Sequence, residues 1–203
     1  MITREKFELI RNHHGRYASW AVWESQTGEK PKSGTGEMGM FSDHRREELL
    51  PLLRPNVLMV GLNFSRPITD PQPFRNFHDL SPKANDFKIR HAFVGTEFYG
   101  AYMTDVIKLF EEVDSKEVLR HLRNNPNLIE ENIQIFRQEI ADLGANRPTI
   151  LAFGKDAHAI LKLALQPEEY GHLIKATHYS HRIEKESYRR EVWEQIQSAK
   201  ANS

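Results

Sequence analysis

Two short polar clusters follow apolar runs in this chain, and both carry side chains that can bind or activate a small polar group. Residues 57–60 lead to Gly61, and Asn63 stands two residues past that glycine, where a strand end would present its amide to a ligand. Far along the chain, a second apolar run precedes His178 and Ser180, within the sequence Thr-His-Tyr-Ser-His-Arg. Two polar clusters at the ends of strands of one sheet are the minimal outline of an active site.

Each of these residues also has a purely structural interpretation. An asparagine after a strand glycine often satisfies its own side chain within a turn, and a single histidine in a loop is often incidental. His178 and His181 could instead bind a metal ion, but a three-residue spacing without acidic neighbours is a weak metal signature. We therefore predict no metal site and no cofactor.

The elements that position these clusters are predicted from the spacing of apolar residues. We expect four strands, over residues 57–61, 101–104, 149–154 and 172–177. The helices that should cover them span residues 105–110, 125–143, 155–165 and 184–199. Strands that alternate with helices are typical of a parallel sheet covered on both faces. The patterns thus predict an α/β fold, a three-layer α/β/α sandwich with a four-stranded, mainly parallel sheet, as a single domain over residues 1–203.

Two further segments frame this predicted sheet. Residues 1–54 read as an N-terminal helical extension, with one or two helices over residues 3–24 and a short helix over residues 42–53. Residues 63–96 hold several prolines and read as a long irregular stretch. Long loops within a compact domain are usually functional, so this stretch is expected to frame the pocket.

Composition excludes several classes of function. The 203 residues include no cysteine, which excludes disulfides, a thiolate nucleophile, cysteine-bound zinc and iron–sulfur clusters. The 28 basic and 28 acidic residues balance, so the whole molecule exerts no net attraction on nucleic acid, although a local basic face remains possible. No run approaches the roughly 18 apolar residues of a membrane span, and the N-terminus lacks the apolar centre of a secretory signal. We expect a cytoplasmic, monomeric protein with no membrane partner.

The order of three segments resembles the uracil-DNA glycosylase superfamily. Residues 57–67 are similar to the first motif of its mismatch-specific and thymine-DNA glycosylase branch, where a strand runs into Gly-hydrophobic-Asn-Pro. Residues 149–161 resemble that superfamily's third strand and the helix after it, and residues 178–180 stand at the place of its second motif, usually His-Pro-Ser. The resemblance implies a glycosylase-like fold and a DNA-repair enzyme that hydrolyses the N-glycosidic bond of a damaged or mismatched base in DNA.

That resemblance, together with the chemistry of glycosidic cleavage, suggests roles for individual residues. Asn63 would hold the attacking water, and His178 would donate to the base carbonyl where negative charge grows. Phe64 or Phe77 would stack on the flipped base, close to Gly61. The DNA backbone would be contacted by Ser65, Arg66, Ser180 and Arg182.

Three positions depart from the family pattern and leave alternatives open. Phe64 and Tyr179 replace the prolines that normally follow the asparagine and the histidine. Asp105, at the tip of the predicted second strand, stands where several branches carry an asparagine. An ionised carboxylate only accepts hydrogen bonds, so Asp105 would suit a base that offers N–H donors, or would help to activate water. The alternatives are a catalytically degenerate protein that binds a nucleobase or nucleic acid, and a hydrolase of a free nucleoside or nucleotide.

Overall fold

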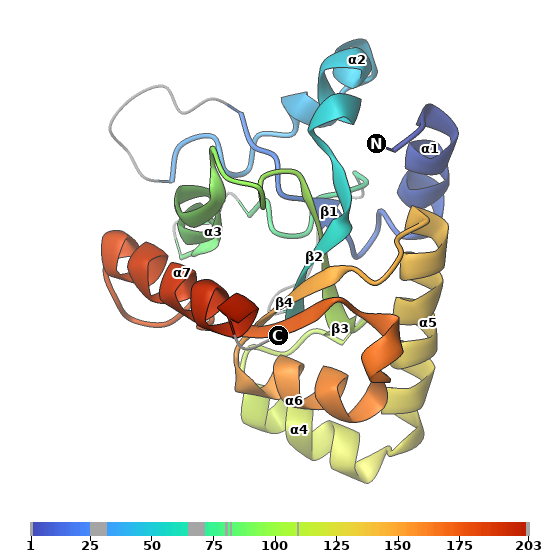
Figure 1. Ribbon diagram of the computed structural model, residues 1–203, viewed down its shortest axis with the longest axis vertical. Helices are drawn as coiled ribbons and strands as arrows, with labels where there is room; N and C mark the ends of the chain where they lie inside the picture. The colour runs from blue at the N-terminus through green and yellow to red at the C-terminus, as the bar shows by residue number, and fades with distance from the viewer. Residues whose placement is uncertain are drawn as a thin grey trace.

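The fold is an α/β arrangement in which a five-stranded, mostly parallel sheet lies between two layers of helices (Figure 1). The computed structural model describes residues 2–24, 32–64, 72–79, 81, 83–108 and 110–201. The predicted α/β class and mainly parallel sheet are confirmed for these residues. The predicted number of strands is wrong, because the sheet has five strands and not four.

The sheet has the spatial order β1-β3-β2-β4-β5. Its strands are β1 (Ser19–Trp20), β2 (Arg54–Asn63), β3 (Ala101–Ile107), β4 (Thr149–Phe153) and β5 (His172–Ala176). The last four run parallel, and β1 pairs antiparallel with β3. From β2 the chain continues to β3 on one side and then crosses to β4 on the other. Ligands of open α/β sheets bind outside the carboxyl ends of the strands at such a reversal.

The two helical layers follow from the alternation of side chains along the strands. Leu58 and Val60 point to one core, and Met59 between them points to the other. Helices α1 (Arg4–His13), α4 (Ser115–Asn124), α5 (Asn127–Leu143) and α6 (Lys155–Ala164) contribute to the first core. Helices α3 (Asp86–Phe93) and α7 (Lys185–Ala201) contribute to the second. Figure 1 shows α5 and α6 on one side of the sheet and α3 and α7 on the other.

The N-terminal extension is less helical than its sequence suggests. The helix α1 is present, but residues 19–20 form the edge strand β1, because they pair with β3 in the sheet. The predicted helix over residues 42–53 is broken into three short helical segments, η2 (Asp43–Arg45), α2 (Arg46–Leu49) and η3 (Leu50–Leu52), and a further 3-10 turn, η1 (Gly39–Phe41), precedes them. Pro51 explains the end of α2, since proline cannot continue a helix.

The boundaries of β3 and the helices near it also differ from the prediction. The strand extends to Ile107, so Asp105 lies inside it and not at its tip, and no helix follows directly. Two helices, α3 and α4, are absent from the sequence-based prediction; α3 lies inside the stretch that reads as irregular. A short 3-10 turn, η4 (Pro167–Glu169), precedes β5. Within the described ranges, none of the helices combines the length and the apolar character needed to cross a membrane.

Candidate functional site

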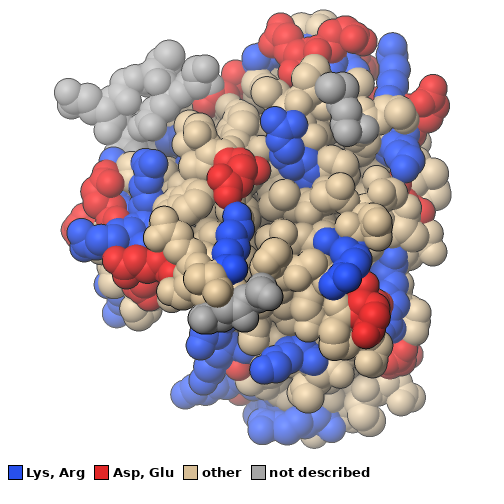
Figure 2. Space-filling view, in the orientation of Figure 1, with Lys and Arg blue, Asp and Glu red and all other residues tan. Residues whose placement is uncertain are grey.

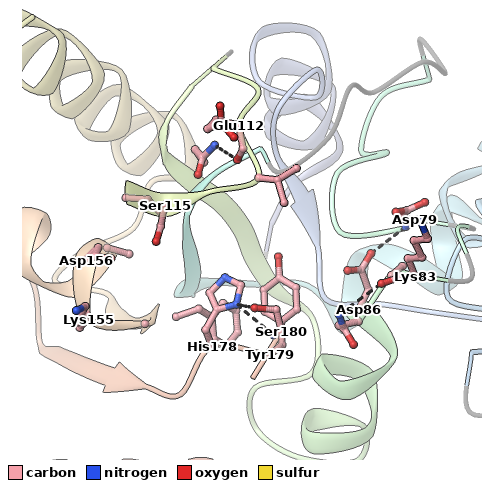
Figure 3. A pocket seen from close by; sticks show the side chains of 18 residues that line it. Asp79, Lys83, Asp86, Glu112, Ser115, Lys155, Asp156, His178, Tyr179 and Ser180 are labelled. Atoms are coloured by element: carbon pink, nitrogen blue, oxygen red, sulfur yellow. Dashed lines mark hydrogen bonds between the residues drawn. The ribbon is translucent and has the colours of Figure 1, made fainter. Parts of the chain in front are cut away.

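A pocket of about 520 Å³ lies at the carboxyl end of the sheet, where the order of the strands reverses. Its walls come from the end of β2, the start of α6, the turn after β5, and the loops that lead into α3 and α4. Figure 3 shows Lys155 and Asp156 on one side, Asp79, Lys83 and Asp86 on the other, and His178, Tyr179 and Ser180 between them. The volume falls in the range of about 300–1,000 Å³ that is typical of small-molecule sites.

Asn63, the last residue of β2, lines this pocket and is held by its amide nitrogen. The Nδ2 atom donates to the carbonyl oxygens of Phe64, Phe110 and Glu112, at 2.7, 3.0 and 2.9 Å (Figure 3 marks the bond to Glu112). Only an N–H donor is compatible with three carbonyl oxygens, so the orientation of the amide is unambiguous. Within the described part of the chain, Asn63 Oδ1 receives no donor, which leaves an acceptor for a ligand or water.

His178, in the turn after β5, lines the same pocket. Its Nδ1 atom accepts a hydrogen bond from the backbone N–H of Ser180 at 3.1 Å and lies 2.8 Å from the Ser180 hydroxyl. Because a backbone N–H can only donate, Nδ1 is unprotonated and the ring proton is on Nε2. In Figure 3 the side of the ring opposite Ser180 is turned toward the open centre of the pocket. The imidazole therefore offers one N–H donor there.

Burial sets the charge of this imidazole. It lowers the pKa of His178 to about 4, since transfer out of water penalises the charged form. The ring also stacks on Tyr179, with centroids 4.3 Å apart and an interplanar angle of 22°. At neutral pH His178 is a neutral hydrogen-bond donor in a fixed orientation.

The aromatic wall of the pocket differs from the predicted one. Tyr179 and Phe153 line the pocket and meet edge to face at 5.5 Å. Phe77 packs behind them, 6.4 Å from the Tyr179 ring, and is buried, with 5% of its surface exposed. Phe64 is also buried, and neither residue is among the described residues that line the pocket. The aromatic rings that line the pocket are therefore those of Tyr179 and Phe153.

The turn after β5 is stabilised by hydrogen bonds. The His181 N–H donates to the carbonyl oxygen of His178 at 2.9 Å, and the buried ammonium of Lys88 in α3 donates to the carbonyl oxygen of His181 at 2.6 Å. Burial lowers the pKa of Lys88. The second core layer thus holds the turn that carries His178 in place.

Gly154 connects β4 to α6 and brings the start of that helix to the pocket. Its backbone has φ of 91° and ψ of 166°, a conformation that is essentially restricted to glycine. Its N–H donates to the carbonyl oxygen of Ala176 at 2.7 Å, which ties β4 to β5 at the pocket edge. Lys155 and Asp156, the next two residues, line the pocket. These two residues are absent from the predicted site, although their place directly after a strand-end glycine was a usable signal.

Asp105 lies behind the pocket and is not among its described lining residues. It is buried at 3% exposure beside Gly61, its partner on β2, and a side chain at Gly61 would overlap Asp105 Oδ1. Asn76 Nδ2 donates to Asp105 Oδ2 at 2.8 Å. Burial raises the pKa of Asp105 to about 7, although the Asn76 hydrogen bond opposes this shift. Because Gly61 has no side chain, it leaves room for the buried carboxyl group of Asp105. That group occupies the space beside Gly61, so no open surface remains there for a base.

The predicted DNA-backbone residues separate in the structure. Ser180 lines the pocket, whereas Arg182 is exposed and is not among the described lining residues. Ser65 and Arg66 lie outside the described residues. His181, the partner of His178 in the weak metal alternative, is exposed, and His178 Nδ1 is already engaged by Ser180.

Charges of both signs surround the pocket. Four carboxylates line it, from Asp79, Asp86, Glu112 and Asp156, against the two ammonium groups of Lys83 and Lys155. Figure 2 shows that Lys and Arg side chains gather at the lower end of the displayed face, over α4 and α6, and mix with acidic ones elsewhere.

A comparison with known protein families, with curated proteins and with solved structures found no match in any of the three.

Proposed function

We propose that this protein is a glycosylase-like hydrolase that cleaves the N-glycosidic bond of a nucleobase held in the pocket, with a damaged or mismatched base in DNA as the leading substrate. One observation carries the proposal: Asn63 and His178, far apart in the chain, line one pocket, and among the described residues each has a single defined hydrogen-bonding atom left for a ligand. These atoms are an acceptor, Asn63 Oδ1, and a donor, His178 Nε2–H. Such a pair suits hydrolysis of a glycosidic bond, which needs a positioned water and stabilisation of the departing base.

The acceptor suits the attacking water. Asn63 Oδ1 would take one hydrogen bond from the water and direct its oxygen at the anomeric carbon of the sugar. An amide is too weak a base to deprotonate water, so the bond between that carbon and the base nitrogen must break largely before attack. The water oxygen then bonds to the cationic sugar carbon, and the proton released passes to solvent.

The donor suits the departing base. The electron pair of the broken bond moves into the base, and the negative charge develops on its carbonyl oxygen. A neutral His178 with its proton on Nε2 would donate to that oxygen without giving up the proton. The low pKa of His178 is consistent with this role, because the imidazole stays neutral over the whole physiological range. Tyr179 and Phe153 would provide the aromatic surface on which the base rests, in place of Phe64 and Phe77.

A hydrolase of a free nucleoside or nucleotide is a second candidate, and the charges around the pocket favour it. Four carboxylates repel a continuous phosphate backbone but can accept hydrogen bonds from sugar hydroxyl groups. The DNA candidate draws its support from α4, whose first residue, Ser115, lines the pocket and whose Lys116 and Arg123 are exposed. In this proposal these two side chains would contact phosphates beyond the pocket.

The test uses two sets of substrates with the same variants. Oligonucleotides that carry uracil, hypoxanthine, xanthine, or G·U and G·T mismatches are incubated with the protein and then cleaved by alkali at abasic sites; the matching free nucleosides are followed by release of the base. Asn63→Ala and His178→Ala should each reduce the rate by about 100-fold or more, and His181→Ala in the same turn serves as the matched control. No release of base from any substrate would overturn the proposed hydrolysis, and binding without release would identify a nucleobase-binding protein.

A further pair of substitutions separates the two substrate classes. Lys116→Gln with Arg123→Gln should weaken activity on oligonucleotides and leave activity on nucleosides unchanged if DNA is the substrate. Activity on nucleosides alone, unaffected by this pair, would assign the protein to the second candidate.

A further inference from the structure

A cluster of metal-ligating side chains lies at the opposite end of the sheet from the pocket. His13 and His14 form the C-terminal end of α1, and Asp142 is close to the C-terminal end of α5, shortly before β4 begins. The ligand atoms of these three side chains all lie within 4.8 Å of one another. We propose that His13, His14 and Asp142 form a binding site for a divalent transition-metal ion such as Zn²⁺.

Two of the three distances between ligand atoms lie on either side of the spacing in a tetrahedral metal site, and the third is no more than 4.8 Å. Asp142 Oδ2 lies 2.7 Å from His14 Nε2 and 3.7 Å from His13 Nδ1. Zinc bonds to nitrogen and oxygen ligands of about 2.0–2.2 Å in tetrahedral geometry place neighbouring ligand atoms about 3.3 Å apart. A metal ion would therefore require the first pair to open and the second to close by roughly half an ångström each, which side-chain rotation can supply.

In two of the three side chains, the atom that would not bind the metal is already held by a partner. His14 Nδ1 lies 2.7 Å from the Tyr17 hydroxyl, and the other oxygen of Asp142, Oδ1, accepts a hydrogen bond of 2.7 Å from Gln138 Nε2. Histidine ligands usually donate their second ring N–H to such a partner, which fixes the tautomer and the orientation of the ring. Here that arrangement leaves His14 Nε2 and Asp142 Oδ2, which lie 2.7 Å apart, as the atoms available to a metal ion.

The exposure of the three side chains provides an entry path and an open coordination position. The His14 and Asp142 side chains are 5% and 14% exposed, whereas the His13 side chain is 61% exposed. His14 and Asp142 are thus fixed by packing, and the exposed His13 would complete the site from the solvent side. Water would occupy the fourth position of a tetrahedral ion.

A simpler interpretation is a hydrogen bond between His14 and Asp142 that joins α1 to α5 without any metal. The two interpretations differ in the role of His13. The structural bond requires nothing from His13, which contacts Asp142 only at 3.7 Å, whereas the metal site needs its imidazole. The exposed position of His13 also makes its substitution safe for folding.

The experiment is a calorimetric titration of the protein, first stripped with a chelator, with ZnCl₂ and NiCl₂. We expect one site per chain in the unmodified protein, and at least 10-fold weaker binding in His13→Ala and in Asp142→Asn. His44→Ala and His181→Ala, which remove exposed histidines elsewhere, are the matched controls and should bind as the unmodified protein does. Circular dichroism checks that each variant is folded.

Cobalt provides a second readout of the same site. Bound Co²⁺ absorbs visible light strongly in a tetrahedral environment, so the unmodified protein should develop this absorption and His13→Ala should lose it. Saturable binding that is unchanged in His13→Ala, or no binding in the unmodified protein, would overturn the proposal and leave the hydrogen bond between α1 and α5.

Discussion

The ammonium of Lys88 donates a hydrogen bond of 2.6 Å to the carbonyl oxygen of His181, and this bond joins α3 to the turn that carries His178. The two residues are 93 positions apart in the chain. The orientation of the imidazole in the pocket therefore depends on a helix that contributes no part of that turn. This relationship makes Lys88 a positioning residue for the proposed reaction.

Lys88→Met should reduce hydrolysis by up to about 100-fold, because it keeps the apolar stem of the side chain but frees the turn to shift by about 1 Å. Lys88→Arg should restore part of the activity. Single-turnover rates with saturating substrate measure the effect, and Lys175→Met, at an exposed lysine of β5, is the control. Equal rates in Lys88→Met and the unmodified protein would exclude a positioning role.

Asn63→Asp should destabilise the protein more than Asn63→Ala does. The aspartate would place a carboxylate oxygen against the carbonyl oxygens of Phe64, Phe110 and Glu112, whereas alanine only removes their donor. Loss of the donor alone should cost about 1–3 kcal/mol. Urea denaturation at pH 7 compares the two variants, and an aspartate variant as stable as the unmodified protein would show that the amide does not anchor residues 110–112.

His178 should remain the neutral Nε2–H tautomer from pH 5 to pH 8. Its pKa is about 4 in the folded protein, against 6.5 for an unperturbed imidazole, so the unfolded chain binds more protons between these two pH values. The contribution of His178 to stability is therefore complete above pH 6.5 and is lost as the pH falls toward 4. Long-range ¹H–¹⁵N correlation spectra report both the tautomer and the titration; a protonation midpoint near 6.5 would contradict the prediction.

Asp105 should make the unmodified protein less stable as the pH rises, which is the opposite of the effect of His178. Asp105→Asn should remove this loss. The pKa of Asp105 rises from 3.8 to about 7 on folding, so the folded protein binds the extra proton between these values and loses stability as the pH rises through them. The advantage of Asp105→Asn over the unmodified protein should grow from pH 4 to pH 7, by at most about 4 kcal/mol, and then level off. Urea midpoints across this range measure it. A constant difference between the two proteins would show that Asp105 is ionised throughout.

Much of the sheet is predictable because its strands are buried on both faces and therefore read as short apolar runs. The runs that end at Gly61 and Gly154 locate β2 and β4, and the glycine at position 154 marks the start of α6. β1 escapes prediction because it has only two residues and owes its conformation to pairing with β3. α3 escapes because it follows a proline-rich stretch whose composition resembles a loop.

The candidate site is predictable only where it depends on local sequence. Asn63 ends β2, and His178 and Ser180 lie in the turn after β5, so their presence at one end of a parallel sheet follows from topology. How deeply a side chain is buried behind the pocket does not follow from topology. Asp105 is two residues from the end of its strand, and the surroundings supplied by Asn76 and Gly61 hide it behind the pocket. Tyr179 and Phe153 line the pocket and Phe77 does not, and this difference likewise depends on how distant loops pack.

The walls of the pocket are contributed by five segments that extend from Leu62 to Ser180. These segments are spread over more than half of the chain, so occupancy of the pocket is thermodynamically linked to global unfolding. Any compound that binds there should raise the Tm, and at 100 times its Kd it should add about 2.7 kcal/mol to the free energy of unfolding. The thermal denaturation of the unmodified protein is thus a direct assay for its ligand, one that requires no assumption about the reaction.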